Sequence, residues 1–387
     1  MLVALIHTCS DVYAPLQSMM ARSFHVDVFF TQLSMALFMC SVAMSQLFYG
    51  PYSDCYGRKK TIIIGLSVML LGSLMTSLAN NIILFIVGRM VQGFGVGVAA
   101  AMWRCILRDC FQGDQLIRVA GYVTLCFVVC ISGAPMLGSL LANVAWRFVF
   151  QCLLVINAIA LVITIFGFEE TQQHQSERWS LPHIKQTMGL FFGNVTYMGL
   201  CCCVLFTFGA FFTWFVAGPI IVTEVLGLPH EVFSFYSLLV CGGMMFCSVQ
   251  LNQWLVSYLT LDHRVYLGWM LMILGGLLMM LFGHQTLQWV WVMVPLSIVV
   301  LGSGLIYPNL FSRIMLPYPN QAGYAGCIYG FLQMVGAGLL SLVVTYLPDD
   351  SIMPLAWLFV LSGVGSACMY FISQHYERQT KCHADLK

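Results

Sequence analysis

The sequence predicts an all-α polytopic membrane protein with twelve transmembrane helices arranged in two six-helix bundles. Three observations predict this fold class: the composition, the spacing of the apolar runs and the distribution of positive charge. Of the 387 residues, 60% are hydrophobic and 8% are charged, whereas about a quarter of the residues in soluble domains are charged. One soluble core could not bury so much apolar surface, so the apolar runs must face lipid.

Twelve apolar runs follow one another along the chain, and all but the first are long enough to cross ~30 Å of hydrocarbon at ~1.5 Å per residue. The first six lie near Leu2–Leu16, Phe29–Tyr49, Thr61–Ala79, Ile82–Trp103, Val119–Leu141 and Phe148–Phe168. The second six lie near Val195–Val216, Phe233–Leu255, Val265–Phe282, Trp289–Phe311, Gly323–Leu347 and Ile352–Phe371. The first run contains Asp11 and Pro15, which do not suit a signal-peptide core, so we expect it to remain as a span.

Lysine and arginine residues set the expected orientation. If both termini are cytoplasmic, all basic residues except Arg22, Arg89 and Arg147 fall in cytoplasmic loops or tails, as the positive-inside rule requires. The polar stretch between the sixth and seventh runs is then a cytoplasmic linker. We expect an N-terminal bundle over residues 1–168, a linker over 169–187, a C-terminal bundle over 188–376 and a cytoplasmic tail over 377–387. Two similar halves are typical of transporters built from repeats.

Composition also excludes several classes of function. The net charge of +1 argues against a nucleic-acid partner. Most of the 16 cysteines lie in apolar runs and none forms a Cys-x2-Cys pair, so we expect packing thiols and no metal site. No P-loop or hydrolytic constellation is present, which predicts that the protein is not an enzyme and needs no cofactor. The expected partners are protons, a small-molecule substrate and membrane lipid, and the expected state is monomeric.

The densest polar segment runs from Gly50 to Lys60, between the second and third runs. Its spacing resembles the loop signature of the major facilitator superfamily, Gly-x3-Asp-(Arg/Lys)-x-Gly-Arg-(Arg/Lys)-(Arg/Lys), with Cys55 in place of the usual base. The resemblance implies a transporter with a gating motif made of Gly50, Asp54, Gly57, Arg58 and Lys59. By the same resemblance, Asp54 acts as a latch: it pairs with Arg58 and accepts hydrogen bonds from the start of the eleventh span, near Gln321 to Tyr324. A solvated loop carboxylate is the alternative.

The fourth run contains an arginine, Arg89, within the expected membrane. A charge there costs at least a few kcal/mol (about 2.5–3.5 on insertion scales) unless a carboxylate or a water-filled cavity receives it. The segment Arg89 to Gly97 resembles the facilitator pattern Arg-x2-Gln-Gly-x-Gly, in which the arginine is tied to proton movement. The alternative is an interfacial arginine that snorkels to the membrane surface.

Asp11 in the first run is the expected partner of Arg89, because the two residues should lie at comparable depth. The segment Ser10 to Pro15 resembles the Asp-x-Tyr-x-Pro signature that opens drug:proton antiporters of the Bcr/CflA group. A buried carboxylate beside a base can exchange a proton when its surroundings change. His7 lies one turn earlier on the same helix face and could extend the proton path. The alternatives are a static salt bridge and a packing histidine.

The fifth run carries Gly133, Pro135 and Gly138. Their spacing resembles the antiporter motif Gly-x-x-x-Gly-Pro-x-x-Gly-Gly, although Ala134 and Ser139 replace two glycines. Proline bends a helix and glycine permits close approach, so a hinge-like contact is expected here. Simple close packing is the alternative.

Candidate substrate contacts come from both halves. They are Tyr13, Gln92, Phe211, Trp214 and Tyr236. Aromatic side chains suit flat, lipophilic or cationic ligands, although lipid contact or packing is the more frequent role of aromatic residues in membrane helices.

Together these features predict proton-coupled export of drug-like small molecules or metabolites by alternating access, in a bacterial inner membrane. One alternative is a proton-coupled uptake symporter of a small metabolite, which should carry a charged substrate clamp in the second half. The other is a non-transporting receptor or scaffold, which would need no proton pair.

Overall fold

The structure, a computed structural model, describes the chain except for residues 112, 173–180, 284–287, 319–321, 349–350 and 386–387. Helices form its secondary structure throughout the described residues. The first half contains α1 (Leu2–Asp11), η1 (Ala14–Leu16), α2 (Gln17–Phe24), α3 (Val28–Tyr56), α4 (Arg58–Ser77), α5 (Ile82–Cys110), α6 (Gly113–Ala142) and α7 (Trp146–Gly167).

The second half begins with a short helix before its first long one. Its elements are α8 (Leu181–Gly193), α9 (Val195–Ile220), η2 (Ile221–Val225), α10 (His230–Ser237), η3 (Leu238–Gly243), α11 (Met244–Leu255), α12 (Leu261–Gly283), α13 (Trp289–Met315), α14 (Ala322–Thr345) and α15 (Met353–Asp385). The elements η2 and η3 are single π-helical turns. Helix α8 therefore crosses the expected boundary between the linker and the second bundle.

Ten helices in the described part of the chain are long and apolar enough to cross a membrane, and they match ten of the twelve expected runs. The fifth run forms α6, in which Cys126–Ala142 is a shorter apolar stretch among the described residues. The first run differs from the expectation of one short span. It forms α1, η1 and α2 in succession and continues to Phe24.

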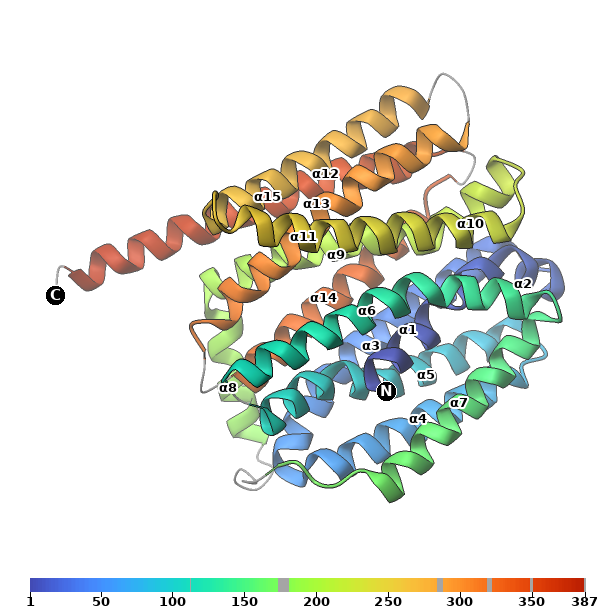
Figure 1. Cartoon of the computed structure of the whole chain (residues 1–387). Coiled ribbons are helices and arrows are strands. Elements are labelled where there is room, and N and C mark those ends of the chain that lie inside the picture. The colour runs from blue at the N-terminus through green and yellow to red at the C-terminus, as the bar shows by residue number, and fades with distance from the viewer. Residues whose placement is uncertain (112, 173–180, 284–287, 319–321, 349–350, 386–387) are drawn as a thin grey trace.

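The two halves lie side by side, and each runs the full length of the molecule (Figure 1). Helix α14 of the second half packs against α3 of the first half and against α9 of its own half. Two glycines permit this double contact: a Cβ on Gly336 would meet the backbone of Leu205, and one on Gly338 would meet Cys40. Glycine at such positions lets helix backbones approach closely.

We call the end of the bundle with Arg58 and α8 the inner end, at the left of Figure 1, and the end with α2 and α10 the outer end. At the outer end, polar contacts join the α2 segment to the second half. Gln17 Nε2 donates to the carbonyl of Phe215 at 3.0 Å, the hydroxyls of Ser18 and Thr223 lie 3.1 Å apart, and Arg22 pairs with Glu224 at 2.9 Å. Helix α2 is thus tied to the end of α9 and to η2, and the outer end is closed.

Candidate functional site

The break in the first span places a carboxylate and an imidazole in the core of the first half. Helix α1 ends at Asp11, and Pro15, which lacks an N–H, lies in the turn that follows. Asp11 is 1% exposed, and its Oδ2 lies 2.7 Å from Nδ1 of His7, one turn earlier. The His7 ring packs edge-on against Phe127 at 4.4 Å. Oδ1 of Asp11 and Nε2 of His7 are buried and have no hydrogen-bond partner among the described residues. The two side chains form a buried acid–imidazole pair.

Arg89 of α5 lies beside this pair and is fully buried. Its Nη1 donates to the carbonyl of Cys9 and to Oε1 of Gln92, each at 2.7 Å. The guanidinium lies 3.9 Å from the ring centroid of Phe38 and 4.9 Å from that of Tyr13, so two aromatic faces stabilise its charge. Nε and Nη2 are buried without a partner in the described part of the chain.

The expected ion pair between Arg89 and Asp11 is therefore not formed. The carboxylate pairs instead with His7, which the i, i+4 spacing on α1 brings to 2.7 Å from it. The last turn of a helix leaves carbonyls without intrahelical donors, and the guanidinium binds one of these, that of Cys9. Arg89 interacts with the end of α1 through its backbone and with the acid through space.

A ring of neutral polar groups completes the site. Ser73 Oγ of α4 accepts from Gln92 Nε2 at 2.9 Å and from Asn157 Nδ2 at 2.6 Å. The thiol of Cys9 lies 3.7 Å from Oδ1 of Asn157, which closes the ring on α1. Ser73 and Asn157 were not among the predicted site residues. The available signal was the amide side chain of Asn157, because the surrounding span Trp146–Gly167 is strongly apolar, with a mean hydropathy of 2.6.

Of the motif residues in α6, Gly138 packs against the break in the first span. A Cβ on Gly138 would lie 2.1 Å from the carbonyl oxygen of Val12, whereas one on Gly133 would meet no atom within 4 Å. The carbonyl of Pro135 accepts a hydrogen bond from the hydroxyl of Ser234, in α10 of the second half, at 3.1 Å. The motif thus connects the turn after α1 to the second half, and its role as a hinge stays a prediction.

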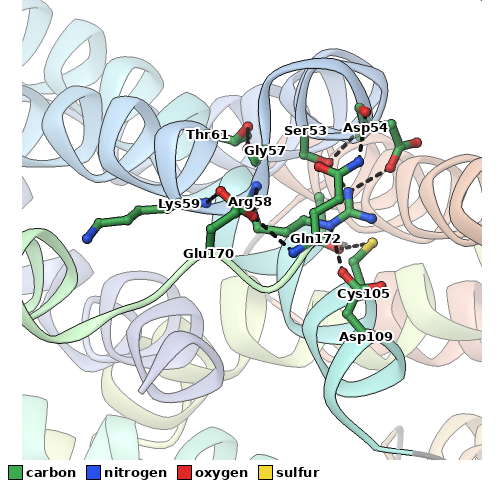
Figure 2. A network of polar contacts seen from close by, with 12 residues as sticks. Ser53, Asp54, Gly57, Arg58, Lys59, Thr61, Cys105, Asp109, Glu170 and Gln172 are labelled. Carbon is green, nitrogen blue, oxygen red and sulfur yellow. Dashed lines mark hydrogen bonds and ion pairs between the residues drawn. The ribbon is translucent and has the colours of Figure 1, made fainter. Parts of the chain in front are cut away.

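At the inner end, Arg58 begins α4 and is clamped by acids from two neighbouring helices (Figure 2). Its Nη1 donates to Asp54 at 2.6 Å and to the hydroxyl of Ser53, both in α3. Its Nε donates to Asp109, near the end of α5, at 3.0 Å. The predicted pair of Asp54 and Arg58 is present, and the contribution of Asp109 was not foreseen.

The linker after α7 supplies a second carboxylate to this junction. Glu170 accepts from the backbone N–H groups of Arg58 at 2.8 Å and of Lys59 at 3.1 Å, in the first turn of α4 (Figure 2). Gly57 precedes this turn with φ +95°, and a Cβ there would lie 2.5 Å from Glu170 Oε2. Only glycine adopts such a φ without strain, so both the backbone and the carboxylate require Gly57.

The Glu170 carboxylate is ionised more readily than an ordinary glutamate. Partial burial opposes ionisation, but hydrogen bonds from several backbone N–H groups together outweigh it and hold the pKa of Glu170 below its ordinary value of 4.5. The positive N-terminal end of α4 favours the same charged form. Glu170 was absent from the predicted motif because it lies more than a hundred residues away in sequence.

The remaining motif residues lie where α3 meets α14. A Cβ on Gly50 would lie 2.2 Å from the sulfur of Cys327, so the two inner ends are in close contact. Asp54 and Tyr324 of α14 are near enough to interact electrostatically. Gln321, the other predicted neighbour of Asp54, lies outside the described residues.

The structure places the two first-half cavity candidates inside that half. The Tyr13 hydroxyl donates to the carbonyl of Thr31 at 2.9 Å, and its ring packs near Phe85. The Gln92 amide joins Arg89 to Ser73, as described above. Both side chains therefore organise the polar site, and a contact between either of them and substrate stays a prediction.

The second-half candidates separate into two groups. Phe211 and Trp214 are buried in α9, and Trp214 Nε1 donates to the hydroxyl of Ser237 at 3.0 Å. Tyr236 instead stacks on Trp289, with ring centroids 5.0 Å apart, on a side chain that is 43% exposed. A contact between substrate and any of these three residues stays a prediction.

Comparison with known proteins gives consistent matches over nearly the full chain. The sequence profile of the Major Facilitator Superfamily matches residues 1–341. Multidrug resistance protein D of Escherichia coli is 28% identical over 369 residues, which cover 94% of this chain and 91% of that protein. A bicyclomycin resistance protein homolog of Haemophilus influenzae is 24% identical over 363 residues, which cover 93% of this chain and 91% of that protein. The crystal structure of the human organic anion transporter MFSD10 shares the fold, with a TM-score of 0.69 at 14% identity, covering 96% of this chain and 98% of that one.

Proposed function

Because this chain belongs to the major facilitator superfamily of transporters, we propose that it exports drug-like small molecules or metabolites in exchange for protons. Membership confirms the predicted family and fold class, and it identifies the protein as a transporter rather than an enzyme. Export is supported by the relatives, which include a multidrug resistance protein and a bicyclomycin resistance homolog. Proton coupling is supported by the polar site of the first half.

The buried pair of His7 and Asp11 is the observation that carries the proposal. With Asp11 ionised and His7 neutral, the carboxylate balances the fixed charge of Arg89. One added proton leaves a net positive charge in a site of low dielectric, which is costly unless water or a rearrangement reduces it. Protonation therefore favours a conformation in which this site is hydrated, and deprotonation favours the sealed one.

The broken first span gives this charge change a route to the outer gate. The turn after Asp11 leads through η1 into α2, and α2 carries Ser18 and Arg22, which bind Thr223 and Glu224 of the second half. A shift of α1 toward or away from Arg89 moves these contacts with it. We infer that proton binding and outer-end opening are linked through this segment, as alternating access requires.

The proposed location is a bacterial inner membrane with both termini in the cytoplasm, since the relatives named above include bacterial proteins. The inner end then faces the cytoplasm, and its Arg58, Lys59 and Lys60 follow the positive-inside rule. A monomer suffices for this mechanism because the two halves of one chain form both gates.

The direct test is export of a panel of dyes, antibiotics, amino acids and siderophores from cells, with and without an uncoupler. We expect at least one compound to be exported in an uncoupler-sensitive way. Asp11→Asn keeps shape and hydrogen bonding but cannot cycle a proton, so it should abolish that export while the protein remains folded in the membrane. Uncoupler-insensitive export, or wild-type pH-dependent export by Asp11→Asn, would contradict the proposal.

A further inference from the structure

Arg104 lies one residue beyond the expected fourth run and was expected on the cytoplasmic side, but the apolar helix continues to Leu107. Nothing described so far uses this arginine. It lies in α5, six residues before Cys110, where that helix ends. Its Nη1 makes one weak hydrogen bond, at 3.4 Å, to the carbonyl of Ala100 in its own helix. The guanidinium lies 4.7 Å from the ring centroid of Trp103 and 5.5 Å from that of Tyr329 in α14. The side chain is partly exposed.

The charge of Arg104 lacks a counter-ion within the part of the chain that the structure describes. Two other arginines of the inner end are each paired with two carboxylates. Arg58 pairs with Asp54 and Asp109, and Arg313 pairs with Asp262 and Glu377. Arg104 pairs with no carboxylate of the described residues. A guanidinium has five N–H donors, and the contacts of Arg104 engage one nitrogen. The residue therefore brings positive charge and unused donors into the membrane span.

Arg104 points between the halves and not toward lipid. A Cβ on Gly330 of α14 would lie 3.3 Å from Arg104 Nη1 and 2.2 Å from Oε1 of Gln46 in α3. Gln46 also donates from Nε2 to the carbonyl of Gly330 at 3.2 Å. Arg104, Gln46 and Tyr329 thus converge on one point of the interface between the halves. An arginine that snorkels to the membrane surface would not contact the other half.

We propose that Arg104 binds the anionic group of the transported molecule, so that the substrates of this protein are small organic anions with a carboxylate and an aromatic or lipophilic body. The planar fork of arginine suits a carboxylate. The ring of Trp103 and the ring of Tyr329 lie beside the guanidinium and give the body of such a ligand an apolar contact surface. The amide of Gln46 adds a neutral donor and acceptor. This assignment rests on the transport function proposed above, and it names the substrate class.

The test measures binding to the purified full-length chain in non-ionic detergent, without any proton gradient. Fluorescein binding is followed by fluorescence anisotropy, and salicylate competes with it. Salicylamide, which has the same ring without the carboxylate, and the cation ethidium serve as ligand controls. The variants are Arg104→Gln and Arg104→Lys. Arg147→Gln is the matched protein control, since Arg147 also lies on a tryptophan ring, 4.3 Å from Trp146, but at the outer end and within one half.

We expect Arg104→Gln to bind fluorescein and salicylate about tenfold to a hundredfold more weakly, the worth of a lost charged hydrogen bond. Arg104→Lys should retain part of the affinity, and Arg147→Gln all of it. For salicylamide and for ethidium, the affinity of Arg104→Gln should be within about twofold of that of the parent. This result shows that the variant is folded.

Three results would overturn the assignment: no binding of either carboxylate to the parent, unchanged fluorescein affinity in Arg104→Gln, or an equal loss for anion, amide and cation. Because the measurement uses no gradient, failure of the proton-coupling proposal is seen separately. If export is insensitive to an uncoupler but binding depends on Arg104, proton coupling is wrong and anion binding by Arg104 stands.

Discussion

At the scale of single residues, the structure changes the assignment of partners around Arg89. One guanidinium nitrogen donates hydrogen bonds to the carbonyl of Cys9 and to the side chain of Gln92, and the guanidinium lies over the ring of Phe38. Arg89→Lys keeps the charge but loses the planar group that spans these contacts. We expect partial loss of export, about tenfold, with a shifted pH optimum in vesicle assays. An unchanged pH profile would show that Arg89 does not act on the acid–imidazole pair.

A second residue-scale prediction concerns Glu170 and pH. Its pKa is lowered in the folded protein, so its contribution to stability is present above its ordinary value of 4.5 and is lost as pH falls through the lower folded value. Glu170→Gln lacks this charge at every pH. In detergent at about pH 7 its unfolding midpoint should lie about 1–2 °C below that of the parent, because the carboxylate is largely exposed.

The gap between parent and Glu170→Gln should close as pH falls through the lowered pKa of Glu170 in the folded protein, since the parent carboxyl is then protonated as well. Glu169→Gln is the matched control, because Glu169 is an exposed neighbour with no hydrogen bond to α4 among the described contacts. A gap that stays constant or widens toward low pH would show that Glu170 does not hold α4 through its charge.

At the scale of elements, the contact between α6 and the break in the first span offers a paired test within one motif. Gly138→Ala places a methyl group 2.1 Å from the Val12 carbonyl, so the helices must separate. We expect about tenfold slower export and a cost of about 1–3 kcal/mol in the free energy of unfolding. Gly133→Ala points into open space and should leave export within about twofold of the parent. Equal effects of the two variants would exclude the close contact as the reason for the motif.

The lengths and order of the spans could be predicted from sequence, because apolar run length and basic residues act locally and additively. The break at the end of α1 could not. Pro15 signals a helix start as readily as a helix end, and the turn depends on Arg89 and Gly138 from distant helices. The partner of Asp11 was predicted wrongly for a similar reason: depth in the membrane was estimated, whereas the i, i+4 geometry of His7 decides the contact.

Parts of the candidate site lay beyond sequence reasoning because they depend on neutral groups. Ser73 bears no charge, and single hydroxyl residues inside spans are too frequent to select. Asn157 is also neutral, and only its position in a strongly apolar span distinguished it. Glu170 joins the gating motif through backbone N–H groups, which leave no trace in the sequence. The pair of Asp54 and Arg58, by contrast, was predicted correctly because both residues lie on adjacent turns of one junction.

At the scale of the whole molecule, each half carries a clamp at the inner end in which one arginine binds two acids. In the second half Arg313, near the end of α13, pairs with Asp262 at the start of α12 and with Glu377 of α15. In the first half the arginine begins α4 and an acid lies near the end of α5, whereas in the second half an acid begins α12 and the arginine lies near the end of α13. Each clamp lies within its own half, so the halves are fixed internally and can move against each other as bodies.

The latch prediction for Asp54 belongs to this scale, because it concerns contact between the halves. Asp54→Asn removes the charge that faces the start of α14 and weakens the pair with Arg58. We expect slower turnover, nearly preserved ligand affinity and a shift toward opening of the inner end. Disulfide crosslinking between cysteines placed at the inner ends of α3 and α14, in a background without the native cysteines, reports that opening.

The disulfide yield should fall in Asp54→Asn and remain at the parent level in Lys60→Gln, whose side chain is exposed and lies outside the gating motif. Identical yields in Asp54→Asn and the parent would mean that Asp54 stabilises its own half without closing the gate.

The break after α1 also has a consequence for how the protein is made. This span is interrupted after Asp11, and Asp11 adds about 2.5–3.5 kcal/mol to the cost of insertion. The translocon therefore receives a segment that inserts poorly by itself, and its favourable contacts with Arg89 and Gly138 arise only after α5 and α6 have been synthesised. The segment should settle into the bilayer late, after its successors. Mapping nascent chains of increasing length with glycosylation tags would locate the moment at which the ribosome has delivered enough of the bundle to hold it.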